Sequence, residues 1–174
     1  LDDVDQQVLN DLPKTVWGAK PTGLWATTRE DALARLHYFV NEILPTFGEH
    51  EDAMLESNWH LAHSLLSPYL NNGLLLPNEV LDAAAQAFSD GKVPINSAEG
   101  FIRQILGWRE YIWNCYWRWM PDYAQRNHLE AHRPLPPLFT NPKKTQMKCM
   151  STVLNGVNEH SYSHHIERLM VLGN

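Results

Sequence analysis

The most constraining feature of this chain is an aromatic run that keeps helical spacing from about residue 97 to residue 119. Four of the seven tryptophans lie between Trp108 and Trp119. Asn96 followed three residues later by Glu99 is typical of a helix start. One side of the expected helix is apolar throughout, with Phe101, Ile105, Trp108, Ile112 and Trp119. Aromatic residues also fill much of the other sides, so the pattern predicts a helix that is buried on several sides.

The other segments predict helices too, and no segment alternates with a period of two, so the expected fold is all-α. Thr27 and Thr28, three residues before Glu30 and Asp31, indicate a helix start, and Pro45 is expected to end that helix. A polar loop is expected over 48–58 and a short helix over 59–69, ending near residue 71. Further helices are expected from Pro77 to a break at Asp90-Gly91, over one turn within 122–131, over 147–157, and from about 161 onward.

Composition excludes several classes of protein. A length of 174 residues suits one domain, and 44% apolar with 20% charged residues excludes a disordered chain. The net charge of −6 excludes a uniformly basic nucleic-acid binder. No apolar run approaches the roughly 18 residues of a membrane span, so no membrane partner is expected. Two cysteines without a disulfide framework favour a reducing, cytoplasmic compartment.

Both ends of the chain suggest a piece of a longer protein. Residues 1–28 carry scattered prolines and glycines and are expected to form an interdomain linker that lies on another surface. Residues 29–174 are expected to form the N-terminal part of a helical domain, truncated at its C-terminus. The cut surface of such a piece is expected to be apolar and to drive self-association.

Two groups of residues have the character of binding sites. Ser64 and Ser67 place two hydroxyls on one side of a helical start, which suits either a phosphate or an ordinary helix cap. Arg109 and Glu110 are charges inside an aromatic helix and need partners, whether neighbouring side chains, a ligand or nucleic acid. Gly107 beside them suggests that something approaches the helix closely.

A histidine pair near the end of the chain is a third candidate. His164 and Arg168 share one helix face, and His165 lies on the adjoining face. The pair is either a proton-donor site or a solvated polar surface. Cys149 alone makes no metal site, and His128 with His132 lacks the pattern of a zinc protease.

Together these segments resemble the helical flavin-binding domain of the DNA photolyase/cryptochrome family over roughly residues 30–174. The stretch from Ser64 to Leu70 is similar to the family's flavin-phosphate motif, with His63 where the family has Thr. The stretch from Gly100 to Tyr111 resembles the helix that lines flavin and substrate, most closely in the bacterial iron–sulfur branch, which includes (6-4) photolyases. Arg133 to Pro136 and His164 to Val171 resemble the same branch.

The resemblance implies a flavin-dependent, light-driven repair protein for UV-damaged DNA, acting in the cytoplasm at the bacterial nucleoid. It implies FAD contacts from Ser64, Leu65, Leu66, Ser67, Gln104, Trp108, Arg109 and Arg168. His164 and His165, chiefly His165, would protonate or orient the lesion. Cys149 matches one of four ligands of a [4Fe–4S] cluster, with the other three outside this chain. An antenna chromophore would belong to a further α/β domain. Two alternatives stay open, a blue-light photoreceptor with the same cofactors and a plain all-α interaction domain.

Overall fold

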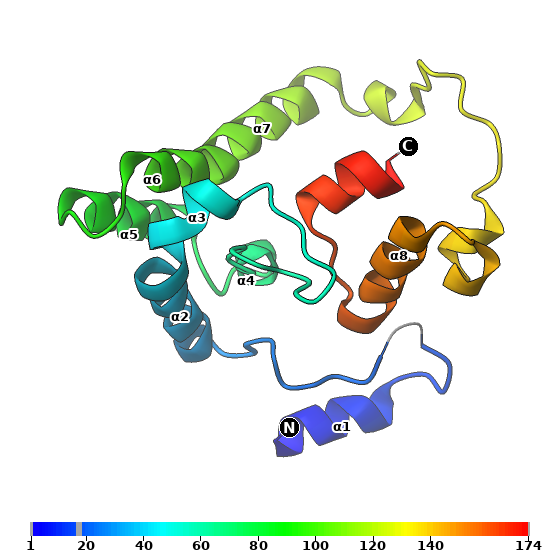
Figure 1. Cartoon of the computed structure of the whole chain (residues 1–174), viewed down its shortest axis with the longest axis horizontal. Helices are drawn as coiled ribbons and strands as arrows, with labels where there is room; N and C mark the ends of the chain where they lie inside the picture. Colours follow the sequence, from blue (N-terminus) through cyan, green and yellow to red (C-terminus); the bar gives the residue numbers. More distant parts are fainter. Residues whose placement is uncertain (1, 17–18, 174) are drawn as a thin grey trace. The chain divides into compact units, whose positions relative to one another are not determined.

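The chain is all-α, as the sequence predicts. The computed structural model describes residues 2–16 and 19–173. Leu1, Trp17 and Gly18 of the expected linker and Asn174 of the expected last helix lie outside the described residues. The described residues contain eight α-helices (Figure 1). Among the same residues, the β structure is limited to one isolated bridge between Leu55 and Asn58. None of these helices combines the length and the apolar character that a membrane crossing requires.

The chain divides into two compact units. Unit 1 comprises Leu1–Thr27, Asp52–Leu61 and Pro137–Asn174, and unit 2 comprises Thr28–Glu51 and Ala62–Pro136. The helices of unit 1 are α1 Asp3–Asp11 and α8 Lys148–His160, with short turns at Pro137–Phe139 and Pro142–Lys144 and a π-helical turn at Glu167–Leu172. Those of unit 2 are α2 Arg29–Tyr38, α3 Leu44–His50, α4 Ser67–Asn71, α5 Pro77–Ser89, α6 Ile95–Ile102 and α7 Trp108–Trp119, with π-helical turns at Phe39–Ile43 and Arg103–Gly107 and a 3₁₀ turn at Asp122–Gln125.

Three phenylalanines form the centre of unit 2, where α3 packs on α6. The ring of Phe39 lies 4.6 Å from that of Phe101 and 6.2 Å from that of Phe47, and all three side chains are buried. The two helices approach closely because Gly48 has no side chain, and its backbone N–H donates to the Oγ of the fully buried Ser97 at 2.9 Å. This contact fixes the position of α6.

Helix boundaries follow local signals except where tertiary packing intervenes. Thr28 caps α2, as predicted, by accepting a hydrogen bond from the backbone N–H of Asp31 at 3.1 Å. The predicted stop at Pro45 is wrong, because a π-helical turn precedes it and Pro45 occupies the first turn of α3, where no backbone N–H is needed. The predicted helix over 59–69 shrinks to Ser67–Asn71, since Leu61 and Leu65 adopt positive φ angles of 43° and 57°.

The aromatic run forms one continuous rod from Ile95 to Trp119, in which a π-helical turn joins α6 to α7 (Figure 1). Pro94, not Asn96, is the N-cap. The expectation of burial on several sides is wrong for α7, which has no buried residue. Phe101 is 3% exposed, whereas Trp108 and Ile112 are 58% and 57% exposed. The two halves of the rod differ in exposure because α6 packs against α3 and α5, whereas α7 extends past these helices.

Aromatic rings from three distant segments pack together in unit 1. Trp59 stacks on His160 with ring centroids 4.3 Å apart and contacts Tyr162 edge-on at 5.2 Å and Trp25 at 6.5 Å. Burial raises the pKa of Tyr162 to about 12. Met150, Val153 and Leu154 form the buried side of α8. These contacts tie residues 25 and 59 to the C-terminal segment.

The segment predicted to be a linker, residues 1–28, contains one helix that was not predicted, α1. Asp2 and Asp5 form a capping box, in which each side chain accepts a hydrogen bond from the other's backbone N–H. No residue of α1 is buried. The helix therefore depends on its cap and on local propensity.

Candidate functional site

The histidine pair lies in unit 1, and its two rings have different environments. His164 is buried, and its Nδ1 accepts a hydrogen bond from the backbone N–H of Ile166 at 3.1 Å. The side chain of Glu167 accepts from the His164 N–H and from the Ser163 hydroxyl. His164 is thus held as a structural element at the start of the last helical segment. The ring of His165 stacks on it at 4.9 Å and is about one third exposed.

Asp52 is the partner that sequence reasoning missed. Its Oδ1 lies 2.9 Å from Nε2 of His165, although 113 residues separate the two positions. A carboxylate at one imidazole nitrogen fixes the ring orientation and makes that nitrogen the donor. No local spacing signals such a pair, so only the folded chain brings it together. Asp52 itself is largely exposed.

The predicted flavin-phosphate segment lies in unit 2, at the start of the short helix α4. Ser64 is half-buried and accepts a hydrogen bond from the backbone N–H of Leu66 at 3.3 Å, while Ser67 is exposed and is the first residue of the helix. Leu65 and Leu66 point into the core and are 4% and 1% exposed. The two leucines therefore hold the segment in place, and the serine hydroxyls lie on either side of them.

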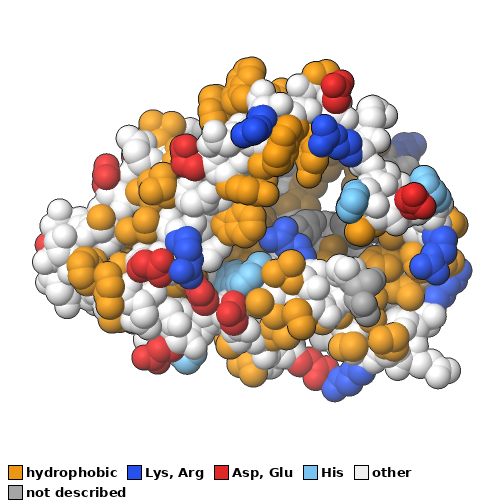
Figure 2. Space-filling model, turned by 90° about the horizontal axis from the view of Figure 1, so that it is seen from above, with side chains coloured by type: hydrophobic (Ala, Val, Ile, Leu, Met, Phe, Trp, Pro, Cys, Tyr) orange, Lys and Arg blue, Asp and Glu red, His pale blue; other side chains and the backbone are white. Residues whose placement is uncertain are grey.

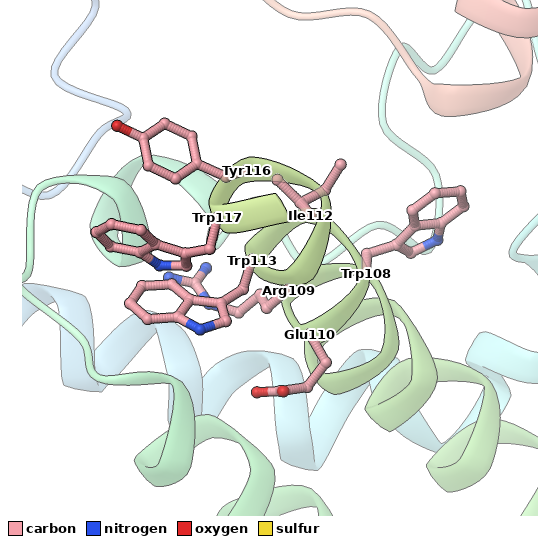
Figure 3. A pocket seen from close by; sticks show the side chains of 7 residues that line it. All are labelled: Trp108, Arg109, Glu110, Ile112, Trp113, Tyr116 and Trp117. Carbon is pink, nitrogen blue, oxygen red and sulfur yellow. The ribbon is translucent and has the colours of Figure 1, made fainter. Parts of the chain in front are cut away.

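Two hollows flank the start of α7, also in unit 2. Gln104 and Trp108 line one of about 510 Å³, together with Arg103, Gly107 and Tyr111. Trp108 and Arg109 line a second hollow of about 630 Å³, together with Trp113, Tyr116 and Trp117 of α7 (Figure 3). Gly107 is not needed for close approach, because an added Cβ would lie at an ordinary 3.6 Å from Cγ of Arg103. Of the predicted flavin contacts, Trp108 therefore borders both hollows, Gln104 only the first and Arg109 only the second.

The two cysteines are free and differ in environment. Cys149 is exposed in the first turn of α8 in unit 1. Cys115 lies on α7 in unit 2, where its hydrogen bond with Tyr111 raises the pKa of that phenol above its usual value. An exposed thiol at a helix start is a suitable single metal ligand. Arg168, the remaining predicted cofactor contact, is exposed in the π-helical turn Glu167–Leu172.

Comparison of this sequence with those of known proteins finds two similar proteins. The chain is 47% identical over 150 residues to a (6-4) photolyase of Agrobacterium fabrum, a match that covers 86% of this chain and 29% of that protein. It is 40% identical over 81 residues to an uncharacterized protein of Acanthamoeba polyphaga mimivirus, covering 46% of this chain and 61% of that protein. No family model matches the chain. This chain is accordingly a relative of the photolyase/cryptochrome family.

Proposed function

We propose that this chain is part of a photolyase-related protein that repairs UV-damaged DNA by light-driven electron transfer from reduced FAD. The observation that carries the proposal is the 47% identity to a (6-4) photolyase over most of this chain. Because the chain spans 29% of that protein's length, the activity belongs to a longer protein that contains this segment. The proposal includes 1–28 as an interdomain segment and 29–174 as part of the flavin-binding helical domain.

The residues of this chain fit the phosphate end of the flavin. The exposed Ser67 hydroxyl and the half-buried Ser64 hydroxyl can each donate a hydrogen bond to a phosphate oxygen. Leu65 and Leu66 anchor the segment in the core, and Gln104, Trp108 and Arg109 supply a wall beside the hollows on α7. When bound, the reduced flavin would supply the electron for repair on illumination.

His165 is proposed as the residue that moves a proton to the lesion. Asp52 holds its Nε2 at 2.9 Å and so fixes which nitrogen donates to the carboxylate. In the doubly protonated ring, the proton that can be transferred is then the one on Nδ1 of His165, and the neutral ring that remains keeps its Nε2–H on the Asp52 carboxylate. His164, which is buried with Nδ1 engaged by the backbone, supports the position of its neighbour.

The remaining partners belong to the same proposal. Cys149 would supply one of four ligands to a [4Fe–4S] cluster, and its exposed thiol is chemically suited to that role. UV-damaged DNA is the macromolecular partner, in the cytoplasm at the nucleoid. An antenna chromophore would bind outside this chain.

The test uses the longer protein and measures flavin absorbance and the repair of (6-4)-damaged DNA under blue light. We expect His165→Ala to lower the repair rate by about 10²–10⁴-fold with flavin content unchanged. Asp52→Asn should lower it less, because the ring stays in place but loses its anionic partner. The matched control is His132→Ala, an exposed histidine in the 126–136 loop, which should repair normally.

Three outcomes would contradict the proposal at different points. A longer protein without flavin absorbance removes the cofactor and with it the whole assignment. Flavin without repair in the unmodified protein favours the photoreceptor. Normal repair by the His165 variant removes the proton-transfer role while leaving the repair assignment intact.

A further inference from the structure

The turn that follows α4 in unit 2 contains an exposed Asn-Gly pair, Asn72-Gly73. Asn72 is the C-cap of α4, and Gly73 has a φ angle of 80°, which glycine adopts without strain. Nothing lies within 4 Å of the position that a Cβ on Gly73 would take. Among the described residues, the Gly73 N–H donates a hydrogen bond to no acceptor. The backbone nitrogen of Gly73 is therefore accessible.

The side chain of Asn72 is folded back along this turn. Its Oδ1 accepts a hydrogen bond from the backbone N–H of Leu74 at 3.1 Å, so the side chain spans the Gly73 peptide. The Leu74 peptide is itself held in place, because its carbonyl accepts from the Arg29 guanidinium at 2.8 Å. A fixed donor at a carbonyl oxygen stabilises the negative charge that develops there when a nucleophile attacks the carbon. The turn thus places an activated amide carbon beside an accessible nitrogen.

Two similar pairs elsewhere in the chain lack this combination. The other Asn-Gly pair, Asn155-Gly156, lies within α8, where the backbone N–H of Gly156 is part of the helical hydrogen bonding. The Asp90-Gly91 pair lies in an exposed turn, but the Gly91 N–H donates to the carbonyl of Phe88 at 2.9 Å. Its side chain is also a carboxylate, which is a poorer electrophile than an amide. The structure therefore singles out one of the three pairs.

We propose that Asn72 is a site of spontaneous covalent modification, at which its side-chain amide is converted to a carboxylate. The Gly73 nitrogen gives its proton to a base in the solvent and attacks Cγ of Asn72. The new N–Cγ bond forms, the Cγ–Nδ2 bond breaks, and ammonia leaves with a proton from water. A second water then opens the cyclic imide at either carbonyl and gives aspartate or isoaspartate. Water is the co-reactant, and no group is oxidised or reduced.

The modification should weaken the end of α4. It places a negative charge near the last carbonyls of the helix, where the helix dipole disfavours an anion. Isoaspartate also inserts a methylene group into the backbone of the turn, which displaces the hydrogen bond to Leu74. We therefore expect the modified chain to melt at a lower temperature. Because α4 begins at Ser67, the change would affect the segment proposed for the flavin phosphate, but the modification does not depend on that role.

The test compares the two Asn-Gly pairs in one sample of this chain. The chain is incubated at mildly alkaline pH, both folded and in guanidinium chloride, and peptide mapping by mass spectrometry measures the modified fraction at Asn72 and Asn155 over time. In the folded chain Asn72 should react at least about tenfold faster, because Asn155 reacts only after α8 opens locally. In the unfolded chain the two rates should be similar. The product adds one negative charge to a chain of net charge −6 that exposes side chains of both signs (Figure 2), so anion-exchange chromatography separates it.

Asn72→Gln should abolish this acidic species in the folded chain, and the matched control Asn155→Gln should retain it. Far-UV circular dichroism establishes that both variants are folded, and the rates in the unmodified chain decide the question if either is not. Equal rates at Asn72 and Asn155 in the folded chain overturn the proposal. Modification of Asn72 in guanidinium chloride alone overturns it as well, because the folded turn would then protect the amide.

Discussion

Replacing Gly48 by alanine tests whether α3 and α6 pack as closely as the structure shows. A Cβ at this position would lie 2.6 Å from the Asn96 side-chain nitrogen and 2.8 Å from two backbone atoms, the Asn96 carbonyl carbon and the Ser97 nitrogen. Side-chain rotation can relieve the first clash, but only a shift of α6 relieves the other two. That shift also stretches the 2.9 Å hydrogen bond from the Gly48 N–H to the buried Ser97 hydroxyl.

The magnitude follows from three opposing effects. Overpacking costs about 1–3 kcal/mol, and weakening a buried hydrogen bond costs about 1 kcal/mol more. Alanine gains up to about 1 kcal/mol because Gly48 lies within a helix. We therefore expect Gly48→Ala to lower the free energy of unfolding by about 1–3 kcal/mol, and the melting temperature by about 2–12 °C. Urea and thermal unfolding followed by far-UV circular dichroism measure both quantities.

Gly156→Ala is the control for helix propensity alone. Gly156 lies in the middle of α8, and nothing is within 4 Å of an added Cβ. This variant should gain up to about 1 kcal/mol, so the two glycine substitutions should change stability in opposite directions. A Gly48→Ala protein as stable as the unmodified chain would refute the close approach of α3 to α6.

Three further predictions concern local contacts of particular side chains. Thr28→Ala should cost about 1 kcal/mol of stability in urea unfolding because it removes the N-cap of α2, whereas Thr27→Ala should have little effect; equal losses would contradict the assigned cap. Between pH 10 and 12 the unfolded chain loses the Tyr162 proton while the folded chain keeps it, so stability should fall with rising pH by about 1–2 kcal/mol. Tyr162→Phe should lack this part of the decline, and an identical pH profile would refute the burial. In the longer protein, Ser64→Ala with Ser67→Ala should weaken flavin retention at least about tenfold, measured by absorbance after dialysis, and full retention would exclude the serines as phosphate ligands.

The sequence by itself determined the features that depend on neighbours within about four residues. The all-α class, the cap at Thr28 and the limits of α5 at Pro77 and Asp90 are confirmed. So is the helix near 147–157, found at Lys148–His160. Helical periodicity, capping hydrogen bonds and helix-breaking residues all act over this short range, so their signals are present in the linear chain. The motifs that carry the family resemblance are likewise contiguous.

Tertiary structure decided which residues meet across the chain and which faces are covered. Asp52 reaches His165 across 113 positions, and Gly48 meets Ser97 because two helices cross there. Helical spacing identified α7 as apolar but could not say whether another element packs on it, and Trp108 and Ile112 are exposed. Burial depends on the positions of distant elements, and a pattern with a period of 3.6 residues contains no information about them.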